Sequence, residues 1–521
     1  MFERLIISGF GVIGTEVFHQ IVKRNKLKKL HISIIEKDFL NFPGGVAYSR
    51  DNSKYGFFNN PLRLSNNEFK NWVKKIPNQR KLIKYFRDNR DLNLDKWLKK
   101  NIKKNKYEFL NLKEIYLPRS AYSFFLEEKF SQTLKILSKK KNFIKVDFYE
   151  NELIKVLKFN DQYKCLFKSK LIKKNLIKDK SFLIKKKYNN KSKKNLISDS
   201  LILGLGILPP SNVNSNIAFK DKNYIHDFYS SGGTNNLITK LKNFNYKKNN
   251  ITLIFIGNKA GLLETMQEIE NLNQQTHKKL NILSISPSNL TLQKAEFSKK
   301  YSTHKFRYLI PKNIKKIKKA QTILSLIKNE FSFGQKKDFN KYDIWTHILE
   351  SNILEKCYKK LNLNQKKIYD NKVFSRLRSL TRYTFPETVD AKNRLEKLNI
   401  LKNLNDKVIK LKKLQNKIEV KTLKSGTLIG DIVVNVSGPV SLFKNQNEVP
   451  FLKSLKKVCK KFNERGFTSD EFFQITDKIY APGTLSSNFN PQRKTIIKSI
   501  TENCVIAAKH FVKSKGGQSW N

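Results

Sequence analysis

The stretch that decides the fold is Leu5-Ile6-Ile7-Ser8-Gly9-Phe10-Gly11-Val12-Ile13-Gly14, close to the start of the chain. The apolar run over residues 4–8 predicts a buried strand, and the residues after it predict a helix to about residue 26. The first glycine permits a tight turn, the second lets the backbone approach a pyrophosphate, and the third lets the helix pack on the sheet. Gly9, Gly11, Ile13 and Gly14 are therefore predicted cofactor-binding residues.

An acidic residue stands where a ribose contact would be expected. Residues 30–36 predict the next strand, and Glu36 at its end follows Gly14 by 22 residues. A carboxylate there accepts hydrogen bonds from ribose hydroxyls and repels a 2′-phosphate. We therefore predict an adenine dinucleotide site that includes Glu36 and the adjacent Lys37. The alternative is a glycine-rich packing turn beside an exposed glutamate.

A second unit of the same kind occurs about 245 residues later. Residues 251–257 and 281–286 predict two strands with a helix to about residue 273 between them. The turn reads Gly257-Asn258-Lys259-Ala260-Gly261, with Lys259 in place of the middle glycine. Its side chain could obstruct a pyrophosphate, or its ammonium could bind a phosphate. The turn therefore predicts either a nicotinamide dinucleotide site or a packing unit that binds no cofactor.

Several further segments resemble, in the same order, an FAD/NAD(P)-binding flavoprotein family that carries a Gly-Val-Ala-Tyr-Ser segment and includes flavin monooxygenase-like proteins. The matching segments are residues 41–49 (Asn-Phe-Pro-Gly-Gly-Val-Ala-Tyr-Ser), 57–65, 117–123, 203–210, 254–261 and 434–439. The resemblance implies that Gly9, Gly11, Gly14 and Glu36 hold the ADP half of FAD.

The same resemblance implies further cofactor contacts. It places Gly44, Gly45, Tyr48 and residues 59–65 near the flavin or its substrate, together with Arg119. A packed loop aromatic is the alternative for Tyr48, and a structural ion pair is the alternative for Arg119. The remaining cofactor candidates lie at strand ends and before the last helix, expected over about residues 494–512: Gly206, Gly257, Lys259, Gly438, Gly483, Thr484 and Arg493.

The charge of the chain is unusual, with 104 Lys and Arg against 43 Asp and Glu, a formal net charge of +61. Only 15 residues are arginine and the lysines are spread along the chain, which favours compositional drift over a selected polyanion surface. No apolar run reaches membrane-spanning length. The four cysteines lie far apart in the sequence, and the first residues do not resemble a signal peptide. Both observations favour a cytoplasmic protein. No metal-ligand spacing occurs, so no metal is expected.

The predicted fold class is α/β, with a Rossmann-like FAD-binding domain of the two-dinucleotide-binding flavoprotein type, an inserted smaller dinucleotide-type domain and a helical segment. The predicted boundaries are 1–210 for the first part of the FAD-binding domain, 211–310 for the inserted domain, 311–415 for a helical substrate or cap segment, and 416–521 for the last part. Residues 168–194 are interpreted as a Lys-rich insertion.

The predicted function is an FAD-dependent oxidoreductase, specifically an NADPH- or NADH-using monooxygenase of a small molecule. The predicted partners include no specific nucleic acid, and the sequence leaves the catalytic residues, the substrate and the oligomeric state open. Two alternatives remain: an FAD oxidase or dehydrogenase without a nicotinamide site, which Lys259 favours, and a non-catalytic binding module with a flavoprotein fold.

Overall fold

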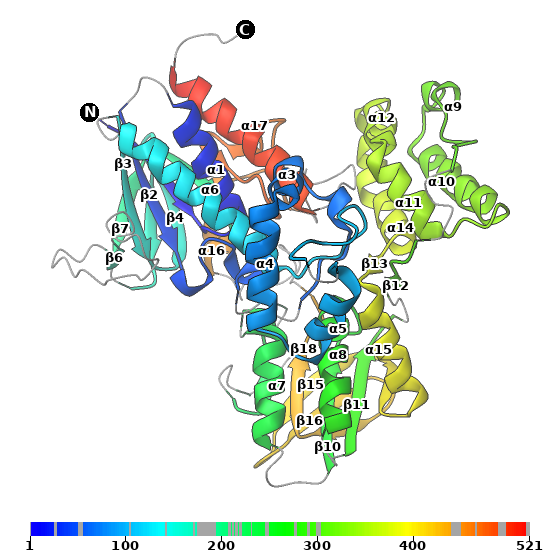
Figure 1. Ribbon diagram of the computed structural model, residues 1–521. Coiled ribbons are helices and arrows are strands. Elements are labelled where there is room, and N and C mark those ends of the chain that lie inside the picture. Colours follow the sequence, from blue (N-terminus) through cyan, green and yellow to red (C-terminus); the bar gives the residue numbers. More distant parts are fainter. Residues whose placement is uncertain are drawn as a thin grey trace.

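The computed structural model describes residues 2–25, 29–50, 56–103, 106–140, 143–169, 172–174, 194–206, 210, 213, 217, 221–230, 232–244, 250–275, 279–288, 292–297, 304–438, 450–463, 466–487 and 496–516. Two open sheets dominate this part of the chain, together with smaller sheets and two groups of helices (Figure 1). Most of the predicted Lys-rich insertion, and the candidate Arg493, lie outside the described residues.

The first sheet has seven strands in the order β21-β22-β8-β1-β2-β3-β6, of which the central five are parallel. Ile7 of β1 lies between Ile34 of β2 and Ile202 of β8. The predicted strand–helix–strand unit is therefore confirmed at the N-terminus. The strand bounds are β1 Glu3–Ser8, β2 Leu30–Glu36, β3 Ile144–Glu150, β6 Ile172–Lys174, β8 Ser200–Leu203, β21 Gln474–Thr476 and β22 Ile479–Tyr480.

Both faces of this sheet are covered, because alternate side chains of a strand point in opposite directions. Leu5 and Ile7 pack against α1 (Val12–Arg24), α6 (Ser120–Lys139) and α17 (Ile496–Gly516), which cover one face (Figure 1). Ile6 packs on the opposite face. The elements there are β4 (Leu153–Phe159), β5 (Gln162–Phe167), β7 (Asn195–Ser198) and α16 (Pro450–Val458).

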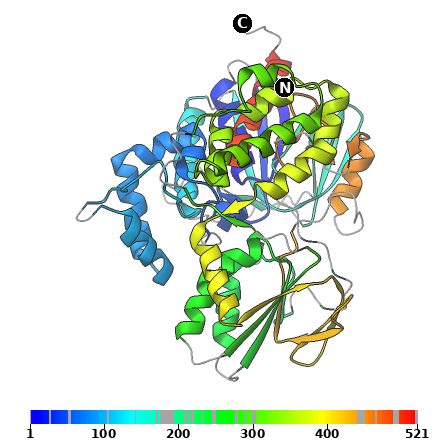
Figure 2. The same cartoon turned by 90° about the vertical axis from the view of Figure 1, so that its right-hand side faces the viewer.

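The second sheet has the order β14-β11-β10-β18-β9, with all pairs parallel. Helices cover one face and a three-stranded antiparallel sheet covers the other (Figure 2). The parallel strands are β9 Tyr224–Ile225, β10 Asn250–Ile256, β11 Lys279–Ser286, β14 Leu401–Asn405 and β18 Ile432–Asn435, the helices α7 Gly233–Phe244, α8 Ala260–Gln275 and α15 Pro386–Lys397, and the covering strands β15 Val408–Lys413, β16 Ile418–Thr422 and β17 Thr427–Gly430.

β14 and β18 pair within this second sheet and β15–β17 cover it, whereas the predicted boundaries divide residues 401–435 between the helical segment and the FAD-binding domain. The helices of the predicted segment end at residue 397, and strands follow from residue 401. β10 lies between β11 and β18. One of its two neighbours, β18, therefore comes from a distant part of the chain, and so does the edge strand β14. Burial of Ile432, Val433 and Val434 accounts for the apolar run in β18.

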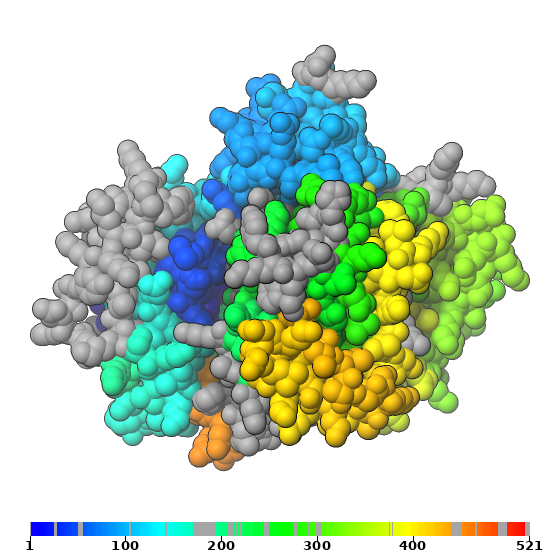
Figure 3. Space-filling model, turned by 90° about the horizontal axis from the view of Figure 1, so that it is seen from below, coloured from blue at the N-terminus to red at the C-terminus, as the bar shows by residue number. Residues whose placement is uncertain are grey.

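Two helical groups complete the described part of the chain. One joins β2 to β3 and contains α3 (Asn67–Lys74), α4 (Ile76–Asp88) and α5 (Leu92–Asn101). The other has its own apolar core and, seen from below, lies at the right-hand edge of the molecule, beside the second domain (Figure 3). Its helices are α9 Pro311–Lys315, α10 Ala320–Gln335, α11 Lys341–Glu350, α12 Ile353–Lys359, α13 Leu363–Ile368 and α14 Phe374–Leu380.

Candidate functional site

The first glycine turn is fixed by sterics. Gly9 has φ +87°, and a Cβ on it would lie 2.7 Å from the Gly204 carbonyl oxygen at the end of β8. A Cβ on Gly14 would lie 2.2 Å from the Gly9 carbonyl oxygen. No side chain fits at either distance, so both residues must be glycine for β1, β8 and α1 to meet.

The second glycine of the motif faces another predicted loop. A Cβ on Gly11 would lie 3.3 Å from the Cα of Gly45, which has φ +63°. A Cβ on Gly44 would lie 2.5 Å from the carbonyl oxygen of Tyr48, so α2 (Gly45–Tyr48) also needs its glycines. Gly11 is the N-cap of α1 and no side chain caps the helix. The first-turn N–H groups of α1 have no partner within the helix, which is the arrangement that binds a phosphate.

Glu36 is anchored at the same turn. Its carboxylate accepts hydrogen bonds from the backbone N–H of Phe10 at 2.6 Å and of Asp38 at 3.2 Å. Burial raises the pKa of Glu36, and the backbone hydrogen bonds oppose that shift. A carboxylate offers about four lone-pair sites, so capacity remains for a ribose hydroxyl. The neighbouring Lys37 pairs with Glu152 at 3.3 Å, with its side chain largely exposed.

The C-terminal segment returns to the start of α1. A Cβ on Gly483 would lie 2.3 Å from Cδ1 of Ile13, a buried residue of the first turn. The Thr484 hydroxyl donates to the Gly206 carbonyl oxygen at 3.1 Å. No atom lies within 4 Å of a Cβ built on Gly206, so this residue faces open space. The predicted residues from both ends of the chain are thus brought together here.

Arg119 and Tyr48 lie in a cluster that connects the two domains. Arg119 directly precedes α6, and its guanidinium forms an ion pair with Glu264 of α8, with both side chains about 15% exposed or less. Its Nε donates to the Phe57 carbonyl oxygen at 3.0 Å. Burial lowers the pKa of Arg119, but Glu264 together with Tyr229 and Tyr48 raises it, so the net shift is upward.

Two tyrosines complete this cluster. Tyr229 forms a hydrogen bond with Glu264, and burial followed by the Glu264 charge raises its pKa. Burial also raises the pKa of Tyr48, whose ring packs on that of Phe58 with centroids 5.8 Å apart. The sequence offered no signal for Tyr229, and the ion pair expected as the alternative role of Arg119 is present. This cluster fixes how the second domain meets the first.

The second glycine turn uses its glycines for packing. Gly257 has φ +115°, and a Cβ on it would lie 2.7 Å from the Val436 carbonyl oxygen. A Cβ on Gly261 would lie 2.9 Å from the Val436 side chain. Lys259 directly precedes α8, and Gly438 has φ +93° with open space around it just beyond β18.

A buried polar atom stands beside Lys259. The Asn258 side chain is buried and its Nδ2 donates to the Ser288 carbonyl oxygen at 2.8 Å. Its Oδ1 has no hydrogen-bond partner among the described residues. An unsatisfied buried acceptor costs about 1–3 kcal/mol, so a donor on a bound molecule would be favourable here.

Two parallel sheets, each with a glycine turn that leads into a helix, define a flavoprotein fold with two dinucleotide-binding domains, as predicted. Residues 6–172 match the model of the FAD-NAD(P)-binding family. The match confirms the predicted resemblance and the FAD-NAD(P)-binding character of the first domain.

The whole chain has the fold of solved flavin monooxygenases. The ornithine N-hydroxylase of Kutzneria sp. 744, solved with reduced FAD, NADP⁺ and L-ornithine, is 10% identical, with 99% of this chain and 100% of that chain covered at a TM-score of 0.53. The FAD-bound cadaverine monooxygenase of Erwinia amylovora is 9% identical, with 99% and 95% covered at a TM-score of 0.51. No curated protein matches the sequence. Within the described residues, no helix has the length and apolar character needed to cross a bilayer.

Proposed function

We propose that this chain is an FAD-dependent monooxygenase that uses NADPH or NADH and acts on a small molecule in the cytoplasm. The observation that carries the proposal is the convergence of Gly11, Glu36, Gly206 and Thr484 around the uncapped start of α1. When bound, FAD supplies the chemistry of hydride acceptance and oxygen activation. The four cysteines are all buried and unpaired, which supports a reducing compartment.

The chain's own residues would bind and orient the cofactor. The N–H groups at the start of α1 would hold the pyrophosphate, and the missing Cβ of Gly11 lets the Gly44–Gly45 loop lie close to that site. Glu36 would accept a hydrogen bond from a ribose hydroxyl, and Lys37 would lie at the exposed rim. Gly44, Gly45 and Tyr48 would contact the flavin half from the loop that faces Gly11.

The second glycine turn would take the nicotinamide dinucleotide. Asn258 Oδ1 would accept from a hydroxyl of that cofactor, and the Lys259 ammonium would pair with a phosphate. The protein backbone at Gly257 and Gly438 would lie close to the bound cofactor. The Arg119–Glu264 ion pair would hold this domain at a fixed angle to the first.

One observation favours a different oxidoreductase. Gly257 and Gly261 both pack closely on Val436, so the turn is explained without a ligand, and Lys259 occupies the place of the middle glycine. An FAD oxidase or dehydrogenase that needs no nicotinamide cofactor would have this structure too.

The test begins with the absorption spectrum of the purified protein between 300 and 550 nm, with identification of the cofactor released on denaturation. Anaerobic mixing with NADPH and with NADH follows. The proposal expects released FAD and rapid bleaching of the flavin by one of the two. Released FAD with no bleaching by either would favour the oxidase or dehydrogenase. A colourless protein that cannot be reconstituted with FAD would refute both.

The Lys259→Ala variant separates the two nicotinamide hypotheses. A phosphate contact predicts slower bleaching at limiting NADPH or NADH and an unchanged limiting rate at saturation, because only binding is weakened. An obstructing side chain predicts faster bleaching at limiting cofactor.

A further inference from the structure

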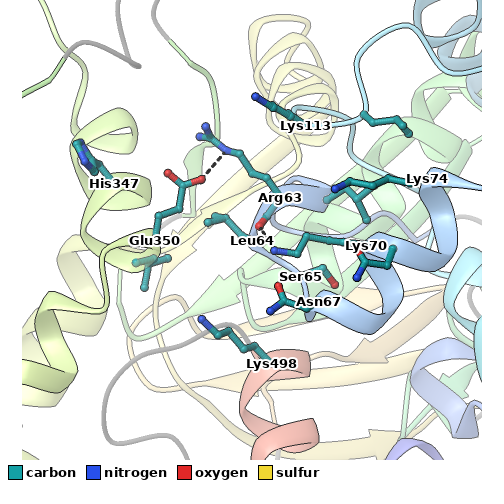
Figure 4. A pocket seen from close by; sticks show the side chains of 14 residues that line it. Arg63, Leu64, Ser65, Asn67, Lys70, Lys74, Lys113, His347, Glu350 and Lys498 are labelled. Carbon is teal, nitrogen blue, oxygen red and sulfur yellow. Dashed lines mark hydrogen bonds and ion pairs between the residues drawn. The ribbon is translucent and has the colours of Figure 1, made fainter.

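A cavity of about 670 Å³ lies between the first domain and the helical segment, and the dinucleotide sites do not include it (Figure 4). Its wall includes residues 62–65, which follow the Gly44–Tyr48 loop and belong to the segment predicted to lie near the flavin or its substrate. α3, α11 and the first turns of α17 complete it. A cavity of this volume suits a small organic molecule.

The wall of this cavity is strongly cationic. Five cationic side chains line it, against the single carboxylate of Glu350: Arg63, Lys70, Lys74, Lys113 and Lys498. Among the described residues, none of the four lysines forms an ion pair with a carboxylate. Burial lowers the pKa of Lys70, and the charges of Lys498 and Lys74 lower it further. The charge of Glu350 opposes this shift only in part, and the cationic side chains of the wall outnumber its carboxylate.

Arg63 is held in place rather than free on the surface. Its side chain is only 10% exposed and pairs with Glu350 at 3.3 Å. Its guanidinium lies 4.2 Å from the centre of the Phe297 ring, and a nitrogen lies 3.4 Å from the Thr346 hydroxyl. These contacts fix one positive charge at the junction between the two parts of the molecule.

A hydroxyl adds hydrogen-bonding capacity to the same wall. The buried Oγ of Ser65 has no hydrogen-bond partner among the described residues. The next residue, Asn66, donates to the Tyr122 hydroxyl at 2.9 Å, and the Tyr122 ring packs on Tyr48 with centroids 5.3 Å apart. The cavity wall therefore continues into the loop that faces the first glycine turn.

We propose that this cavity binds the substrate, and that the substrate is a small organic molecule with at least two phosphate or carboxylate groups. Several ammonium groups and a guanidinium in one cavity attract such an oxyanion and repel an amine. Cadaverine, the compound for which one structural neighbour is named, has two amino groups and no carboxylate, and this wall is unsuited to it. The assignment as substrate site rests on the proposed monooxygenase function, whereas anion binding does not.

The first experiment measures binding directly, by calorimetry on the FAD-loaded protein at low ionic strength. Citrate and pyrophosphate are the anionic probes and cadaverine is the cationic probe. The double variant Lys74→Gln/Lys113→Gln removes two exposed charges from the cavity. The matched control, Lys410→Gln/Lys421→Gln, removes two exposed charges that face each other on β15 and β16 of the second domain.

Both anions are expected to bind more tightly than cadaverine. The cavity variant should weaken citrate binding about tenfold or more, while the control leaves it within about twofold, because short-range charge-assisted contacts are lost only in the first case. Equal weakening by both variants would refute the site, because the affinity would then follow net charge alone. Absence of anion binding, or tighter binding of cadaverine, would refute it as well.

A second measurement tests the assignment to substrate. Oxidation of NADPH or NADH by the wild-type enzyme is measured with phosphorylated and polycarboxylic compounds and with diamines. Acceleration by an anion, lost in the cavity variant, supports the proposal, and acceleration by a diamine overturns it. If neither cofactor reduces the flavin while citrate binding is intact, the monooxygenase function fails and the anion site stands.

Discussion

Loss of the Arg119–Glu264 ion pair is expected to have the largest effect on stability, because the pair is buried and connects two domains. We consider Glu264→Gln, which keeps the shape and an oxygen acceptor but removes the negative charge. Both side chains are about 15% exposed or less, so water cannot solvate the guanidinium that remains. Removing one partner of a buried pair costs about 3–5 kcal/mol. In Glu264→Gln, Arg119 keeps its hydrogen bond from Nε to the Phe57 carbonyl, and the glutamine amide still offers an acceptor. The expected loss in the free energy of unfolding is therefore about 3 kcal/mol.

The assay is urea unfolding at pH 7, followed by far-UV circular dichroism at a fixed saturating FAD concentration, because bound ligand stabilises the folded state. The control is Glu268→Gln, one turn further along α8. Glu268 accepts from the neutral Asn93 side chain at 2.6 Å, also across the domain junction. Its expected loss is below about 1.5 kcal/mol, because the glutamine oxygen can still accept from Asn93 and only the charge assistance of that hydrogen bond is lost.

The double variant Arg119→Met/Glu264→Met distinguishes a buried charge from a simple loss of contacts. An apolar pair of similar size often matches or exceeds the stability of a buried ion pair. The double variant should therefore be more stable than Glu264→Met alone and than Arg119→Met alone. A double variant whose loss equals the sum of the two single losses would refute the reasoning, because it would show that neither charge is uncompensated in the single variants.

Three further predictions concern the first domain. Gly11→Ala places a Cβ 3.3 Å from Gly45 Cα and is expected to weaken FAD binding about 30-fold in a fluorescence titration, whereas Gly426→Ala, in a turn of the second domain, should leave it unchanged. Glu36→Gln should weaken FAD binding about tenfold. It should also stabilise the FAD-free protein at pH 8, because burial raises the pKa of Glu36, so the wild type loses stability as pH rises through that value. Burial lowers the pKa of His19 to about 4, so the native state resists protonation, and stability should fall by on the order of 3 kcal/mol between pH 6.5 and 4. In urea unfolding at pH 7 and pH 4.5, His19→Gln should remove much of this fall, and an equal fall in that variant would contradict the assignment.

The glycine turns were predictable because their cause is local. A positive φ at Gly9 and the contact of Gly14 with the Gly9 carbonyl arise within six residues, and the apolar strands on either side have a clear pattern. The place of Glu36 follows from the length of one helix and one strand. The same argument found the second turn, including the unusual Lys259, although it could not decide whether that turn binds a cofactor.

Features that depend on distant segments were not predictable. β14 and β18 join β11 and β10 across more than one hundred residues, so the sequence pattern identified strands but not their sheet. Glu264 reaches Arg119 across 145 positions, and no periodicity links them. The cationic cavity combines residues from three distant parts of the chain, and the even spread of lysine concealed it.

The arginines give a way to find such junctions in a chain this rich in lysine. Arg119 contacts a carboxylate and a backbone carbonyl at once, and Arg63 contacts a carboxylate, a hydroxyl and an aromatic ring. A planar guanidinium can serve several partners in fixed directions, whereas an ammonium is a compact point charge. Both residues lie at domain or segment junctions, where one side chain with several donors in fixed directions can hold two separate segments.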